Sequence, residues 1–126
     1  QLIKAMIKKG INVEGSNVLI LGFTFKENCP DIRNTRIIDV VKELGNYSCN
    51  VDIFDPWVDA EEVEEEYGII PVSEIKAASY DAIIVAVGHE QFKKMGSTDI
   101  RGFGKDKHVL YDLKYILSPE QSDVRL

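Results

Sequence analysis

Three basic side chains lie near one another in a chain that is otherwise acidic. Lys26, Arg33 and Arg36 follow an apolar run, whereas the whole chain has 15 Lys and Arg against 21 Asp and Glu. Cations at the end of a strand and beside the start of a helix can bind an anion, because their charge and the free N–H groups of the helix converge. The same cations can instead pair with Glu27 and Asp31 on a solvated loop. The residues alone leave both interpretations open.

A glycine-rich turn for binding a dinucleotide is missing from this loop. From Gly22 to Arg33 the sequence GFTFKENCPDIR contains one glycine, whereas the G-x-G-x-x-G turn uses three to bring the backbone close to a pyrophosphate. We therefore expect no complete NAD site of that type. Asp55 ends a predicted strand, where a ribose-binding acid often lies, but an Asp55-Pro56 pair is more typical of a turn.

Neither Cys29 nor His89 is predicted to be catalytic. A thiol near cations can be activated, but Cys29 has no base nearby in sequence. His89 ends a predicted strand and precedes Glu90, which would suit acid–base chemistry, although a histidine that caps a helix or bonds to the backbone is more common. The two cysteines and two histidines are not spaced as zinc ligands, so no metal site is expected.

Short apolar runs alternate with amphipathic segments along the chain. The runs are rich in β-branched residues and predict strands at 17–23, 51–55, 68–72, 81–89 and 108–113. Helices are predicted at the N-terminus up to Gly10, from a cap at Asn34 or Thr35 to about Gly45-Asn46, and at 59–67 and 90–95, with a helical turn at 73–74. This alternation predicts an α/β fold, a Rossmann-like doubly wound parallel sheet in a single domain, with ligands at the carboxyl ends of the strands.

Composition excludes several classes of function. Of the 126 residues, 44% are hydrophobic and 29% are charged, and the formal net charge is −6, which fits one folded domain. No basic patch suited to nucleic acid or to an anionic membrane stands out, and the apolar runs are far shorter than the ~20 residues of a membrane-spanning helix. The two cysteines, interpreted as free thiols, indicate a reducing compartment, so we expect a cytoplasmic protein.

The segment FTFKENCPDIRNTR, followed by FDPWVD, resembles the C-terminal, UDP-binding domain of the UDP-glucose/GDP-mannose dehydrogenase family. It is most similar to the UDP-N-acetylhexosamine 6-dehydrogenases of surface-polysaccharide synthesis, and the resemblance spans most of the chain. It implies an NAD-dependent, two-step oxidation of a UDP-sugar to a uronate. In this family NAD is held mainly by an N-terminal domain. The catalytic residues also lie outside the part that this chain resembles, so the chain alone is expected to be inactive.

The resemblance implies roles for four residues. Phe25 and Lys26 match a substrate-contacting pair after the first strand, and Arg33 matches an arginine that reaches NAD. Lys114 lies where many members have a substrate-binding arginine; lysine keeps the charge for a phosphate but loses the bidentate fork. No catalytic residue is expected here, because Cys29 does not match the catalytic cysteine of the family.

The resemblance also divides the chain. It implies that residues 1–13 end a helix from a preceding central domain, which suits a helix that starts without a capping residue, and that residues 14–126 are the UDP-sugar-binding domain. A homodimer or larger assembly is implied, with its contacts mainly in the central domain. Two other interpretations stay open: a self-contained nucleotide-binding or regulatory module, and an interaction domain whose acidic helix at 59–67 binds a basic partner.

Overall fold

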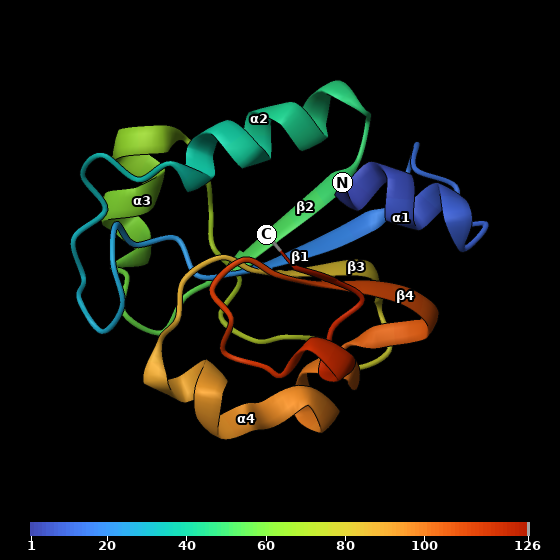
Figure 1. Ribbon diagram of the computed structural model, residues 1–126. Coiled ribbons are helices and arrows are strands. Elements are labelled where there is room, and N and C mark those ends of the chain that lie inside the picture. Colours follow the sequence, from blue (N-terminus) through green and yellow to red (C-terminus); the bar gives the residue numbers. More distant parts are fainter. Residues whose placement is uncertain (126) are drawn as a thin grey trace.

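A computed structural model describes residues 1–125 as a parallel sheet between two layers of helices (Figure 1). The helices are α1 (Leu2–Lys8), α2 (Ile37–Asn46), α3 (Ala60–Tyr67) and α4 (Glu90–Arg101), with a short 3-10 helix at Pro119–Gln121. The strands are β1 (Asn17–Leu21), β2 (Asn50–Phe54), β3 (Tyr80–Val85), β4 (Gly104–Asp112) and β5 (Val124–Arg125). The predicted Rossmann-like α/β fold is confirmed. None of the described helices has the length and apolar character needed to cross a membrane.

All strands of the sheet are parallel, in the order β2-β1-β3-β4-β5. The chain moves from β1 to β2 on one side and then crosses back to β3 on the other, so the order reverses between β1 and β3. Helices α1 and α2 cover one face of the sheet and α4 covers the other (Figure 1). In open α/β sheets, ligands bind beyond the carboxyl ends of the strands at such a reversal point.

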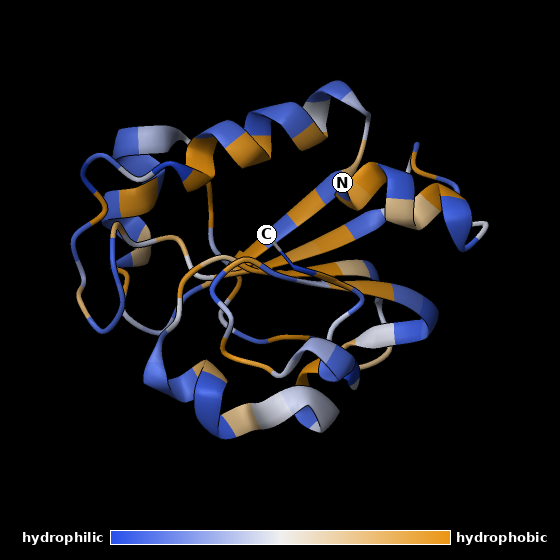
Figure 2. Cartoon of the chain, viewed as in Figure 1, coloured by the Kyte–Doolittle hydropathy of each residue, from blue (hydrophilic) through white to orange (hydrophobic). Residues whose placement is uncertain are grey.

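Strand β1 is buried on both faces, which explains its unbroken apolar sequence. Val18 and Ile20 belong to an apolar cluster with residues of α1, α2 and α3, whereas Leu19 and Leu21 belong to a second cluster with Phe92 of α4. Figure 2 shows β1 mostly in hydrophobic colours and α2 hydrophilic on the side that faces away from the sheet. A two-sided core of this kind is typical of parallel sheets and needs no alternation of polar residues.

Two predicted elements near β2 are wrong. Residues 68–72 are irregular and not a strand, although Val72 donates a hydrogen bond to the carbonyl of Ile53 (2.8 Å). Pro71 has no N–H group to give to a ladder of hydrogen bonds, which prevents regular pairing there. The helical turn predicted at 73–74 is a bend.

The C-terminal part of the chain also differs from the prediction. The sequence predicts a helix that ends at Met95, whereas α4 continues to Arg101 after a break at Gly96, whose φ of 71° and ψ of 176° are not helical. Strand β4 begins at Gly104, ahead of the apolar residues that predicted it. Strand β5 and the 3-10 helix lie where no element was expected.

Gly22 allows the carboxyl ends of β1 and β3 to approach each other. Its φ is +104°, and a Cβ atom at this position would lie 2.6 Å from the Cβ and 2.8 Å from the backbone nitrogen of Val87. Its N–H group donates to the carbonyl of Phe54 at the end of β2 (2.9 Å). Only a residue without a side chain fits both the backbone conformation and the space.

Gly22→Ala is therefore expected to lower the free energy of unfolding by roughly 2–4 kcal/mol, the sum of an unfavourable positive φ and crowding against Val87. Gly15→Ala is the matched control. Gly15 has a φ of +79°, but a Cβ atom there would have no neighbour within 4 Å, so about 1–2 kcal/mol should be lost. Urea unfolding of both variants measures the difference, and equal losses would show that contact with Val87 is unimportant.

Candidate functional site

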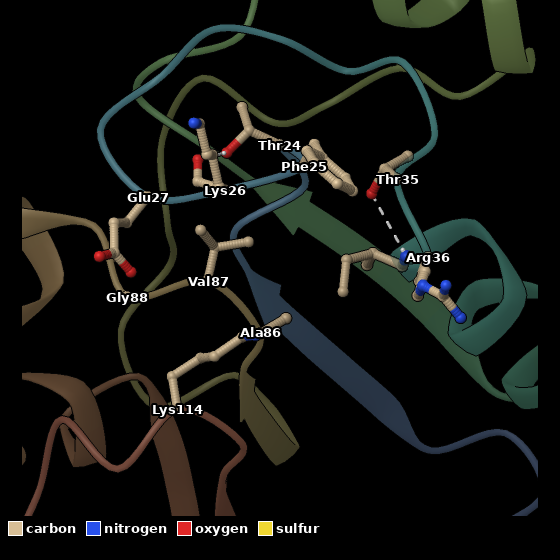
Figure 3. A pocket seen from close by; sticks show the side chains of 11 residues that line it. Thr24, Phe25, Lys26, Glu27, Thr35, Arg36, Ala86, Val87, Gly88 and Lys114 are labelled. Atoms are coloured by element: carbon tan, nitrogen blue, oxygen red, sulfur yellow. Dashed lines mark hydrogen bonds between the residues drawn. The ribbon is translucent and has the colours of Figure 1, made fainter.

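A pocket of about 290 Å³ lies where the strand order reverses, beyond the carboxyl ends of β1 and β3 (Figure 3). Its walls come from the loop after β1, the start of α2, the segment after β3 and the turn after β4. The lining residues are Thr24, Phe25, Lys26, Glu27, Thr35, Arg36, Ile37, Ala86, Val87, Gly88 and Lys114. The pocket therefore occupies the position that the fold predicts for a ligand.

Three basic residues from separate segments line this pocket. Lys26 follows β1, Arg36 precedes α2 and Lys114 follows β4, and all three are exposed. None of the ion pairs found among residues 1–125 involves them. Glu27 is the one acidic residue of the lining. The pocket thus has a positive balance in a protein whose net charge is negative, which suits an anionic ligand.

The loop that carries Phe25 and Lys26 begins at a buried carboxylate. Asp55, 7% exposed, follows β2. Its Oδ2 accepts hydrogen bonds from the N–H groups of Phe23 (2.6 Å) and Thr24 (3.1 Å), and its Oδ1 accepts one from the N–H of Trp57 (2.8 Å). The bond to Trp57 confirms the turn role predicted for Asp55, and the other two join the ends of β1 and β2.

His89 connects the end of β3 to the same carboxylate. The fully buried ring has its Nε2 2.9 Å from Asp55 Oδ2 and 3.1 Å from Thr24 Oγ1, while its Nδ1 accepts the N–H of Asn28 (2.9 Å). Because Nδ1 accepts, the ring proton in this arrangement is on Nε2 and is donated to Asp55. His89 is also the N-cap residue of α4, but its side chain makes no capping hydrogen bond, so of the two predicted structural roles the bond to the backbone is the one confirmed.

These contacts keep Asp55 ionised. Burial alone raises the pKa of the carboxyl group, but hydrogen bonds from His89 and from the N–H groups of Phe23 and Trp57 outweigh it, so the pKa of Asp55 is below its ordinary value. A charge-assisted hydrogen bond is stronger than a neutral one. The carboxylate therefore holds the surrounding backbone firmly at neutral pH.

The outer part of the loop is bound to α3 and α4. The hydroxyl of Tyr67 donates to the carbonyl of Ile32 (2.7 Å), and its ring packs edge-on against Phe23, with 5.3 Å between the ring centres. Asn28 Oδ1 accepts the N–H of Glu90 at the start of α4 (2.9 Å). The loop between β1 and α2 is thus anchored to both α3 and α4.

A second buried carboxylate positions Lys114. Asp112, fully buried at the end of β4, accepts hydrogen bonds from the N–H groups of Lys114 (3.1 Å), Ile116 (3.4 Å) and Leu117 (2.9 Å). The turn after β4 is closed by these bonds, and the backbone of Lys114 is held at the edge of the pocket while its side chain remains exposed.

Arg33, which the resemblance assigns to NAD, lies outside the pocket lining. Its side chain is 84% exposed and binds Asp31 through two hydrogen bonds, Nε to Oδ1 (3.0 Å) and Nη2 to Oδ2 (3.2 Å). These bonds hold the pKa of Asp31 below its ordinary value. Arg33 thus pairs with an acid, as one interpretation of the loop expects, whereas Lys26 and Arg36 line the pocket, where binding of an anion stays a prediction.

Arg36 belongs to the pocket although the resemblance gives it no role. It is the N-cap residue of α2, next to Thr35, whose Oγ1 accepts the N–H of Ile37 (3.3 Å; Figure 3). The sequence predicts Asn34 or Thr35 as the cap of this helix; the structure places the N-cap at Arg36, although the Thr35 hydroxyl still accepts a backbone N–H of the first turn. Cys29 is a partly buried free thiol and is not part of the pocket lining.

The chain is thus a Rossmann-like α/β domain with a cationic pocket at the reversal point of its sheet. Residues 19–119 match the family model described as "UDP-glucose/GDP-mannose dehydrogenase family, UDP binding domain". The chain belongs to this family.

Relatives of the chain are UDP-sugar dehydrogenases. Over all 126 residues it is 88% identical to a UDP-N-acetyl-D-glucosamine 6-dehydrogenase of Salmonella typhi and 56% identical to one of Pseudomonas aeruginosa, and it spans 30% of the length of each. Among solved structures, a UDP-D-ManNAc dehydrogenase from Pyrococcus horikoshii matches with a TM-score of 0.78 at 22% identity, covering 98% of this chain and 28% of that one. That likeness shows the same fold.

Asp55→Asn is expected to lower the free energy of unfolding by about 1.5–3 kcal/mol at pH 7, the contribution of hydrogen bonds to a charged group. The folded-state pKa lies below the unfolded value of about 3.9, so the ionised group stabilises the fold above that pH, and the effect disappears as the pH falls through the folded-state pKa. Urea unfolding from pH 7 to pH 3 should show the difference between the two proteins shrinking below about pH 4. A difference that is constant with pH would contradict an ionised Asp55.

Proposed function

We propose that the pocket binds the UDP portion of a UDP-sugar, and that the chain is the UDP-sugar-binding domain of an NAD-dependent UDP-N-acetylhexosamine 6-dehydrogenase of surface-polysaccharide synthesis. One observation carries the proposal: three basic residues from separate segments line one pocket at the reversal point of the sheet. The family description and the names of the relatives support UDP as the nucleotide and an N-acetylhexosamine as the sugar.

The lining residues suit the parts of such a ligand. Lys26 and Lys114 supply point charges for the diphosphate, and Arg36 adds a planar donor group beside the N-terminus of α2. The ring of Phe25, 54% exposed, offers an apolar surface on which the nucleoside can pack. The pocket, at about 290 Å³, is small for a whole UDP-sugar, so in this proposal the sugar extends beyond it.

The oxidation itself needs parts beyond this chain. The loop after β1 has one glycine and does not suit the pyrophosphate of a dinucleotide, so NAD binds mainly to another domain of the proposed enzyme. Arg33 is exposed and lies outside the pocket lining, and in this proposal it contacts the cofactor held by that domain. The chain thus contributes substrate binding, and none of its residues is assigned a step in the chemistry.

The wider organisation follows the same proposal. Residues 1–13, with α1, end a helix that comes from a preceding central domain, and residues 14–126 form the UDP-sugar-binding domain. Contacts in the central domain make the enzyme a homodimer or larger assembly. The two free cysteines support a cytoplasmic location, where thiols stay reduced.

Lys26→Ala and Arg36→Ala should each weaken UDP binding to the chain by roughly ten- to a hundred-fold, because each removes a charge-assisted hydrogen bond to a phosphate. Isothermal titration with UDP measures the affinity. Lys42→Ala removes the same charge from an exposed position on α2 outside the pocket and should change the affinity less than about twofold. Equal weakening by all three variants would indicate unspecific attraction, and no weakening by the first two would contradict the proposal.

Arg33→Ala in the full-length enzyme distinguishes a role of Arg33 in binding NAD from a role in binding the UDP-sugar. Because Arg33 lies outside the pocket, the variant should raise the KM for NAD more than the KM for the UDP-sugar, by a loss on the order of 1.5–3 kcal/mol. Steady-state kinetics with each substrate varied in turn gives both constants. The opposite order would show that Arg33 serves the UDP-sugar or only braces the loop through Asp31.

A further inference from the structure

His89 is a buried titratable side chain that the proposed binding of UDP does not use. The pocket lining includes its neighbour Gly88 but not His89 itself. The ring lies among the rings of Trp57 and Phe92, at 6.2 Å and 5.5 Å between ring centres, and Asp55 is the charged group that it contacts. Its role must therefore be sought in its hydrogen bonds.

We propose that His89 is a positioning residue for substrate binding: as the Nε2–H tautomer, it links the fixed carboxylate of Asp55 to the amide of Asn28. In this way it holds residues 24–28 in the conformation that brings Phe25 and Lys26 to the pocket. The inference rests on the proposed function of that pocket, but the tautomer and the hydrogen bonds can be tested without any ligand.

Both ends of the segment 24–28 meet this one ring. At its start, the hydroxyl of Thr24 donates to the carbonyl of Lys26 (2.9 Å), so Oγ1 faces His89 Nε2 as an acceptor at 3.1 Å. At its end, the N–H of Asn28 donates to His89 Nδ1. Lys26 lies between the two contacts, so a displaced ring displaces the backbone that carries the lysine.

The conformation of Asn28 makes its hydrogen bond to His89 important. Asn28 has a φ of 55°, in the left-handed region, which is unfavourable for most residues but which asparagine tolerates. Its N–H faces His89, and its side-chain oxygen accepts the N–H of Glu90. If the acceptor on the ring is removed, the N–H of Asn28 loses its hydrogen-bond partner. That bond then no longer offsets the cost of the strained backbone at Asn28.

Two substitutions of His89 test the two ring nitrogens separately. The side-chain amide of His89→Gln places a donor near the position of Nε2 and keeps the bond to Asp55, but it offers no acceptor to Asn28. The shorter His89→Asn places an oxygen near the position of Nδ1 and keeps the acceptor for Asn28, but it does not reach Asp55. A role confined to packing in the core predicts that the two variants behave alike.

The two variants are expected to have opposite effects on stability and on UDP binding. His89→Gln should keep most of the unfolding free energy, yet the Asn28 amide should exchange its hydrogen rapidly and UDP affinity should fall roughly three- to tenfold. His89→Asn should lose more unfolding free energy, yet it should keep protection of the Asn28 amide and most of the UDP affinity. The amide of Phe23, bonded to Asp55, is the internal reference and should remain protected in His89→Gln.

Parallel loss of stability, amide protection and affinity in both variants would overturn the proposal. If neither variant folds, 15N NMR of the histidine rings in the unaltered chain still decides: the proposal requires an unprotonated Nδ1 and a protonated Nε2 in His89 at pH 7, and the reverse tautomer or a doubly protonated ring overturns it. If the unaltered chain binds no UDP while the exchange pattern at Asn28 is as expected, the proposed function fails and the hydrogen-bonding role of His89 stands.

Discussion

A single buried carboxylate joins the three strand ends that surround the pocket. Asp55 accepts hydrogen bonds from Phe23 and Thr24 after β1, from Trp57 after β2 and from His89 after β3. An ionised carboxylate is costly to bury unless donors satisfy its oxygens. A movement that separates these loops would remove hydrogen bonds from the buried carboxylate. The need to satisfy Asp55 with donors from the protein therefore sets the geometry of the site.

The same arrangement lets the pocket stay cationic without being neutralised. Buried acids bind the backbone: Asp55 holds the loop before Lys26, and Asp112 holds the turn with Lys114. The backbone therefore positions the side chains of Lys26 and Lys114, which remain exposed. Among the described residues, neither lysine forms an ion pair. Arg33 shows the alternative, because its guanidinium is occupied by Asp31. Lys26 and Lys114 therefore keep their charge free for an anion in the pocket.

The sequence predicts the sheet well because the signal there is local. The run NVLIL is apolar throughout after its first residue, and only a strand covered on both faces makes use of such a pattern. Residues 68–72 carry a similar apolar signal, but the missing N–H of Pro71 outweighs it. Strand β5, at Val124–Arg125, is too short to leave any pattern.

The site is harder to predict, because its key contacts join distant residues. Phe25, Lys26 and Lys114 follow from the resemblance, and the structure brings them to one pocket. Asp55 and His89, which are joined by a hydrogen bond, are 34 residues apart in the sequence. The sequence around either residue gives no sign that the two are in contact. The conformation of the loop determines that Arg33 pairs with an acid and that Arg36 lines the pocket. The periodicity of the sequence does not predict this difference.

The most direct test is titration of UDP into the 15N-labelled chain, followed through its backbone amide signals. A larger cavity, of about 660 Å³, lies between α1 and α2 and is lined mostly by apolar side chains, together with Lys4, Asp39 and Glu43. An anionic nucleotide should avoid that cavity and choose the cationic pocket. The account predicts that the amides of Phe25, Lys26, Arg36 and Lys114 shift most, and shifts confined to α1 and α2 around the apolar cavity would contradict it.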